Sequence, residues 1–131
     1  MDGMALQLRA TSRAQELPGA VLTYPFGEDW EVFKVCGKVF MLQAEVAGKL
    51  IVTLKATPAD STVLREAQDD IVPGYHMNKR HWITLLPGGT LYPELVDDLV
   101  TESYLLVIEK NVPKSQWPVD PRAFGQNASS D

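Results

Sequence analysis

Apolar residues recur along the first half of the chain with two periods, one helical and one alternating. The chain opens with an apolar stripe at steps of four, four and three residues, formed by Leu6, Ala10, Ala14 and Leu17. Pro18-Gly19 then ends the predicted helix. After a turn-rich link, tight turns at 36–38 and 48–49 separate three short predicted strands, 32–35, 39–44 and 50–55. This pattern predicts an antiparallel meander.

The second half of the chain returns to helical signals, with one further strand between them. Thr57-Pro58-Ala59-Asp60 offers a hydroxyl cap, a proline at the first helical position and an early carboxylate, which predicts a helix to about Ala67. Pro73-Gly74 marks a loop, 82–86 is a predicted strand, and Pro93 opens a third helix. We therefore expect an α+β fold in the order α-β-β-β-α-β-(β)-α, with helices packed on one face of an antiparallel sheet.

Alternate side chains on a strand point to opposite sides, so parity assigns residues to the two faces of the predicted sheet. One aliphatic face is expected to be buried, and it holds Leu50, Val52, Leu54, Phe40, Leu42 and Ala44. The other face is expected to be open to water, and it holds Lys49, Ile51, Thr53, Lys55, Met41, Gln43 and Glu45. Cys36, between strand-like residues, is expected to be a small buried core residue rather than a reactive thiol.

Length and composition predict one folding unit. The chain has 131 residues, of which 45% are hydrophobic and 22% charged, as in ordinary globular proteins. We expect one domain over 1–110 and a Pro-rich, partly disordered tail over 111–131, part of which Trp117 and Phe124 would pin to the domain. The single cysteine, the lack of a basic stretch leading into an apolar run, and the lack of a membrane-length apolar segment predict a cytoplasmic protein with no membrane partner.

Charge is distributed unevenly along the chain. The formal net charge of -5 argues against bulk attraction to nucleic acid. However, residues 71–93 contain no acid at all, whereas acids crowd into the start of the last predicted helix, at Glu94, Asp97, Asp98 and Glu102. We expect cations over the sheet and carboxylates on the helices behind it.

The acid-free stretch holds the densest group of functional side chains, His76-Met77-Asn78-Lys79-Arg80-His81-Trp82. Through this block the chain resembles the YjbR/MmcQ family of small bacterial proteins. The resemblance covers residues 5–110 and has further matches at Pro25-Phe26-Gly27, Phe33-Lys34-Val35, Lys38-Val39-Phe40, Leu54-Lys55, Ser103-Tyr104 and Leu106-Val107. It implies a fold related to the CyaY-like and secretion-chaperone-like architectures, and a DNA-binding role.

The first functional hypothesis is a nucleic-acid-binding module, because phosphates require cations and bases require flat side chains. The candidate phosphate contacts are Lys34, Lys55, Lys79 and Arg80, and the candidate base or sugar contacts are His76, Asn78, His81 and Trp82. If Arg80, Trp82 and Thr84 share the outward parity, these groups gather on the open face of the sheet. In the alternative interpretation, Trp82 is buried, and Lys79 and Arg80 pair with acids of the last helix as a structural latch.

The second hypothesis is a protein-interaction or chaperone-like module with no nucleic-acid role. In it, the same sheet face docks a partner chain or a second copy of the protein through Trp30, Met41 and Ile51. The face would then be a contiguous apolar surface rather than a basic groove.

Catalytic and metal sites are not predicted. His76 and His81 match no zinc spacing, and the chain contains no nucleophile elbow, phosphate loop or dinucleotide glycine pattern. Asp69-Asp70 is expected to be a solvated edge. We therefore expect no enzymatic activity, no metal and no small-molecule cofactor; a deep pocket converging on both histidines would be needed for one of them to act as a base.

Overall fold

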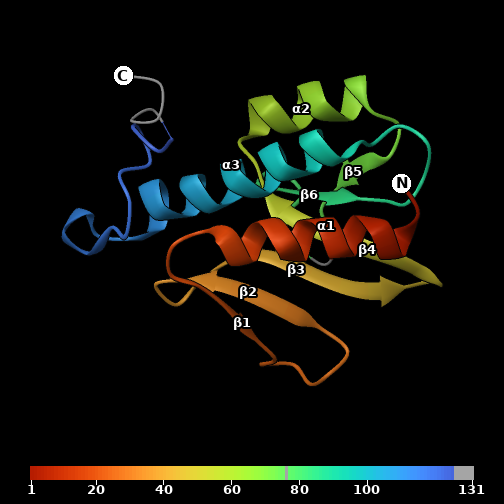
Figure 1. Cartoon of the computed structure of the whole chain (residues 1–131). Coiled ribbons are helices and arrows are strands. Elements are labelled where there is room, and N and C mark those ends of the chain that lie inside the picture. Colours follow the sequence, from red (N-terminus) through yellow and green to blue (C-terminus); the bar gives the residue numbers. More distant parts are fainter. Residues whose placement is uncertain (76, 126–131) are drawn as a thin grey trace.

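The computed structural model describes residues 1–75 and 77–125 (Figure 1). Its elements in chain order are α1 (Gly3–Glu16), β1 (Ala20–Thr23), β2 (Glu31–Val35), β3 (Lys38–Val46), β4 (Lys49–Lys55), α2 (Pro58–Ala67), β5 (Ile71–Pro73), β6 (Trp82–Leu85), α3 (Pro93–Asn111) and the short 3₁₀ helix η1 (Lys114–Gln116). In this described part, the strands form one antiparallel sheet in the order β1-β2-β3-β4-β6-β5. The predicted α+β class and element order are confirmed.

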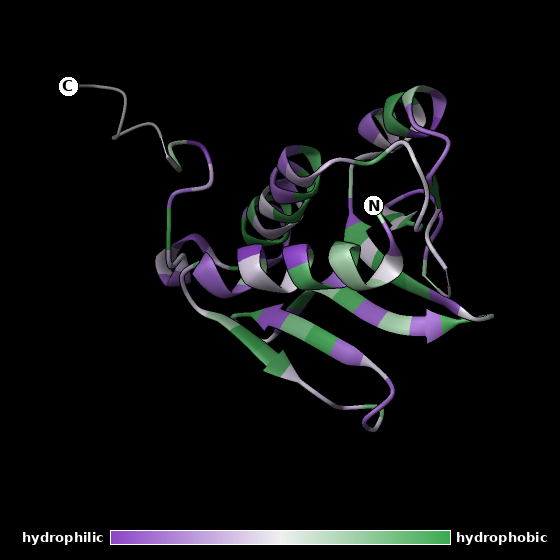
Figure 2. Ribbon diagram, turned by 45° about the vertical axis from the view of Figure 1, so that its right-hand side comes forward, coloured by the Kyte–Doolittle hydropathy of each residue, from purple (hydrophilic) through white to green (hydrophobic). Residues whose placement is uncertain are grey.

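The helices lie on one face of the sheet, with α1 and α3 side by side over its centre and α2 near the β5 end (Figure 1). Hydrophobic and hydrophilic positions alternate along the strands beneath α1, as expected for a sheet with one face against helices (Figure 2). The Arg9 guanidinium of α1 donates two hydrogen bonds, of 2.8 and 2.6 Å, to the Asp97 carboxylate of α3. One turn later, Arg13 donates to the Thr101 hydroxyl at 2.8 Å. One acid of α3, Asp97, is therefore paired with a cation of α1.

Strand β1 was not predicted, because residues 20–23 lie in the segment that resembled a turn-rich link. Gly19, at φ 77°, turns the chain out of α1, and four residues then pair with β2 at the edge of the sheet. The short β5 pairs with β6 to form the hairpin that the prediction left optional.

A β-bulge changes which residues of β3 face the helices. The register between β2 and β3 shifts after Phe33, which lies opposite Met41, so that Phe40 is the extra residue. Phe40 and Met41 are both fully buried in the helix-side core. Beyond the bulge the predicted parity was wrong: Met41 and Gln43 face the helices, whereas Leu42 and Ala44 face the other side. The run Val39-Phe40-Met41-Leu42 is apolar at every position, so its pattern could not indicate this shift.

Ser103 and Tyr104, the pair that carried part of the family resemblance, fasten α3 to the sheet. The Ser103 hydroxyl donates to the Phe40 carbonyl at 2.6 Å and accepts from the Lys55 backbone N–H at 2.8 Å. The Tyr104 hydroxyl donates to the Pro18 carbonyl, and its ring meets Phe40 edge-on at 5.5 Å. Burial raises the pKa of Tyr104 to about 12. Both residues therefore have structural roles.

The segment after α3 packs back on the domain as far as Gly125. Trp117 and Phe124 rest against the helix-side core, as predicted, and the Phe124 ring lies 6.2 Å from that of Tyr104. Residues 126–131, for which disorder was predicted, lie outside the described residues. The prediction for Cys36 was wrong: it is exposed in the turn between β2 and β3. Cys36 and Gly37 both have positive φ, of 50° and 75°, as a tight hairpin turn requires.

Candidate functional site

The sheet face opposite the helices, called here the open face, carries a row of paired residues from neighbouring strands: Thr23, Val32, Leu42, Thr53, Thr84 and Val72. Parity places Lys34, Lys55 and Trp82 on this face as well, as predicted. The prediction that this face is wet was wrong, however, because Ile51, Leu42 and both threonines are buried. Loops folded over the strands exclude water from it.

Residues 74–75 and 77–81, between β5 and β6, cover part of this face. The Gly74 N–H donates to the Trp82 carbonyl at 2.8 Å, and the Tyr75 N–H donates to the Thr84 hydroxyl at 2.9 Å. The Thr84 and Thr53 hydroxyls are themselves hydrogen-bonded at 2.9 Å. A Cβ at Gly74 would lie 2.6 Å from that of Trp82, so glycine is what allows the segment to approach the strand.

The half-exposed Tyr75 side chain lines two of the hollows that the described residues form on the open face. The first, of about 270 Å³, is lined by Phe26, Trp30, Leu42, Thr53, Tyr75 and Met77. The second, of about 210 Å³, is walled mainly by aliphatic residues, among them Val46, Ile51, Val72 and Leu86, with Lys49 on its border. Phe26 is 69% exposed and Tyr75 40%, so two aromatic rings are accessible at the first hollow.

Two of the predicted nucleic-acid contacts, Lys55 and Trp82, have internal partners instead. Trp82 is only 9% exposed and packs with Val32 and Leu42. The Lys55 ammonium lies 5.9 Å from the centre of the Trp82 ring and donates to the Asn111 side chain at 2.9 Å. Burial lowers the pKa of Lys55. Both side chains are therefore engaged in contacts within the chain.

The other candidates of the central block lie in its turn. The Asn78 side chain accepts from the Arg80 N–H at 2.9 Å, which shapes the turn. The Lys79 ammonium donates to the Gly74 carbonyl at 3.3 Å. Lys79, Arg80 and His81 are all exposed. His76 lies outside the described residues.

The latch interpretation is half right. Trp82 is buried, as that interpretation required, but neither Lys79 nor Arg80 forms an ion pair with any residue in the described part of the chain. The acid of α3 that is paired across elements, Asp97, is bound by Arg9. Lys34 faces the open side from β2, half-buried, and lines neither hollow.

The sequence prediction missed several residues of the first hollow. Phe26, Tyr75 and Met77 line it, although each lay within a segment singled out for other reasons. Trp30 and Ile51 were predicted as apolar members of the open face, and they do lie there. The same prediction for Met41 was wrong, because the bulge places Met41 under the helices.

No three His, Cys, Asp or Glu side chains in residues 1–75 and 77–125 are grouped so that they could hold a metal ion. No helix in those ranges has the length and apolar character needed to cross a membrane.

Comparison with known proteins assigns the family. A model of the YjbR family matches residues 15–106. The chain belongs to the YjbR family. The uncharacterized protein YbdF of Escherichia coli O157:H7 is 40% identical to this YjbR-family chain over 121 residues, which are 92% of the chain and 99% of YbdF. The uncharacterized protein YjbR of Escherichia coli K12 is 35% identical over 78 residues, which are 58% of the chain and 66% of YjbR.

Solved structures support the same fold for this YjbR-family chain. The crystal structure of Deinococcus radiodurans protein DR2400, described as a DUF419 domain, superposes with a TM-score of 0.73 at 38% identity, covering 80% of each chain. A crystal structure of a Pseudomonas syringae protein gives a TM-score of 0.67 at 25% identity, covering 76% of this chain and 96% of that one. DNA binding, which the resemblance implied, stays a prediction.

Proposed function

We propose that this YjbR-family protein is a non-enzymatic binding module for single-stranded nucleic acid, which it holds on the open face. The observation that carries the proposal is the combination offered by one segment. Residues 74–75 and 77–81 contribute an accessible aromatic ring, Tyr75, to the first hollow and present two exposed cations, Lys79 and Arg80, that have no ion-pair partner among the described residues. Aromatic platforms beside cations are what unpaired bases and their phosphates require.

Single strands suit this surface better than duplex DNA. Unpaired bases can stack on Phe26 and Tyr75, whereas the base faces of a duplex are already stacked on one another. The hydroxyl of Thr53, which lines the first hollow, is bonded to that of Thr84, which lines the second. Few groups are therefore left to read base edges, and we expect binding that tolerates different sequences.

The test is fluorescence anisotropy with a labelled oligothymidine at several salt concentrations. Two phosphate contacts on a single strand predict a slope of log K against log salt of about -1.4. Lys79→Ala with Arg80→Ala should weaken binding at low salt and flatten this slope. The control, Lys38→Ala with Lys110→Ala, removes the same charge from exposed positions outside the open-face hollows. Absence of binding at low salt, or equal losses in both double variants, would exclude the proposal.

A second candidate function is protein docking through the same face, and the apolar floor of the hollows favours it. Leu42 and Met77 form part of the first floor, and Ile51, Val72 and Leu86 surround the second. A second copy of the chain docked there would dimerise with little dependence on salt. Sedimentation at increasing protein concentration tests this possibility, and Phe26→Glu should abolish any dimer. A monomer at all concentrations would exclude docking of a second copy on this face.

A further inference from the structure

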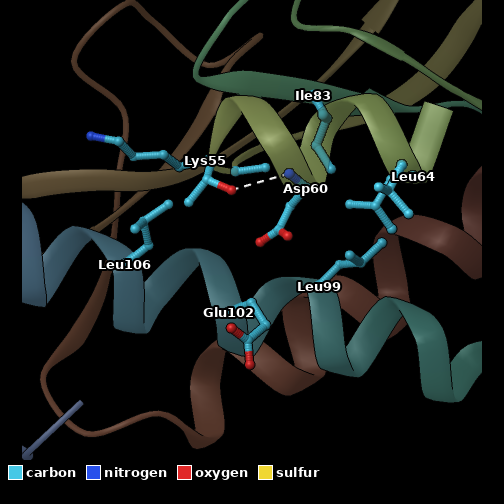
Figure 3. A pocket seen from close by; sticks show the side chains of 10 residues that line it. Lys55, Asp60, Leu64, Ile83, Leu99, Glu102 and Leu106 are labelled. Carbon is cyan, nitrogen blue, oxygen red and sulfur yellow. Dashed lines mark hydrogen bonds between the residues drawn. The ribbon is translucent and has the colours of Figure 1, made fainter. Parts of the chain in front are cut away.

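A hollow larger than either open-face hollow lies on the helix side, in a cleft between α2 and α3. It measures about 320 Å³, which falls at the lower end of the usual range for small-molecule sites. Ile83 of β6 forms its floor, with Leu64 of α2 on one wall and Leu99 and Leu106 of α3 on the other. Figure 3 shows Leu64 and Leu99 facing each other across the cleft. The interior of the cleft is therefore mainly aliphatic, and it suits the hydrocarbon part of a ligand.

The border of this cleft is acidic. Asp60 of α2 and Glu102 of α3 both line it, and in Figure 3 Asp60 extends from α2 toward α3. Neither carboxylate has an ion-pair partner among the described residues. Acidic side chains from two separate helices therefore border one apolar cavity.

The one cation that lines the cleft, Lys55, does not neutralise these acids. Its ammonium is bound to the Asn111 side chain and lies over Trp82. In Figure 3 the Lys55 nitrogen points away from both carboxylates. A ligand that complements the cleft would therefore carry a positive charge on an aliphatic group.

We infer that the α2/α3 cleft is a binding site for a small aliphatic amine. The hydrocarbon chain of the amine packs between Leu64 and Leu99 and is shielded from water there. Its ammonium group donates hydrogen bonds to the carboxylates of Asp60 and Glu102. The site is separate from the open face, so it stands or falls independently of the nucleic-acid proposal.

The test uses three probes with the same chain length, n-hexylammonium, n-hexanol and n-hexanoate, titrated into the protein and followed by two-dimensional amide NMR. We expect hexylammonium to shift the amides of residues that line the cleft and to bind more tightly than hexanol, with hexanoate the weakest. Shifts elsewhere, or equal affinity for the amine and the alcohol, would overturn the inference.

Variants test the role of the carboxylates. Asp60→Asn and Glu102→Gln should each raise the Kd of hexylammonium about two- to fivefold, as expected for a partly exposed ion pair, and should leave hexanol binding unchanged. Glu66→Gln removes an exposed acid of α2 that does not line the cleft and should change neither Kd. The amide spectrum reports whether each variant is folded. A folded Asp60→Asn, Glu102→Gln double variant that binds the amine as tightly as the wild type would contradict the assignment.

Discussion

The two faces of the sheet exclude water by different means. On the helix side, Phe40 and Tyr104 are fully buried, and side-chain hydrogen bonds from α3 reach the backbone of β3, β4 and the α1–β1 turn. On the open face, Trp82 and the threonines are covered by a loop, while Phe26 and Tyr75 remain accessible. The first arrangement fixes the fold. The second leaves two aromatic rings accessible beside a hollow, which is why we place the candidate function there.

The largest expected effect is a loss of stability from truncation on the helix side. Phe40→Ala should lower the free energy of unfolding by about 3–5 kcal/mol, because it leaves a cavity against Tyr104 and Phe33. Met77→Ala, which shortens a half-buried side chain on the open face, should cost less than about 2 kcal/mol. Urea unfolding of both variants measures the difference. Similar losses would mean that the two faces contribute equally to stability.

Hydrogen bonds provide a second comparison of the faces. Ser103→Ala should cost about 2–3 kcal/mol, because it deprives the Phe40 carbonyl and the Lys55 N–H of their bond to the Ser103 hydroxyl. Thr84→Val on the open face should cost about 1–2 kcal/mol, because it removes the partner of the buried Thr53 hydroxyl and releases the Tyr75 N–H, which lies in an exposed residue. Thermal unfolding of the two variants measures both. A greater loss in Thr84→Val would show that the open face is tied as firmly as the helix side.

Local patterns predicted the element positions well because the signals are themselves local. Thr57, expected as a cap, does accept from the Asp60 N–H, at 3.1 Å. The open face depends instead on contacts between distant segments. Nothing near Lys55 in the sequence distinguishes it from Lys79, yet Lys55 is held by Asn111 whereas Lys79 is exposed. The sequence could therefore predict the segment that contains the site. It could not predict which side chains of that segment are accessible to a ligand.

Gly74 tests how closely the covering loop must approach the open face. Gly74→Ala should lower stability by about 1–3 kcal/mol, because the new Cβ would meet the Cβ and backbone of Trp82, which cannot move aside freely. It should also increase the exposure of Trp82, seen as a red shift of tryptophan emission. The matched control is Gly89→Ala, where a Cβ meets nothing within 4 Å and where less than about 0.5 kcal/mol should be lost. Unchanged emission in Gly74→Ala would mean that the loop is not held by this contact.

The smallest expected effect concerns the chain segment that leads from β6, in the sheet, to α3, above it. The Asp70 carboxylate accepts from the Thr90 N–H and from the Thr90 hydroxyl, each at 2.9 Å. The backbone bond from Thr90 is the main cause that lowers the pKa of Asp70 below its ordinary 3.8. Because the folded pKa lies below the unfolded one, the stabilisation is present above pH 3.8 and is lost as the pH falls through the folded pKa.

Asp70→Asn should therefore lower the Tm at pH 7, and the gap from the wild type should close as the pH falls below 3.8. Thermal unfolding between pH 7 and about pH 3 measures this gap. Asp69→Asn, at the exposed neighbouring position, is the control and should show little gap at either pH. A gap for Asp70→Asn that stays constant down to low pH would show that the side chain acts through shape rather than charge.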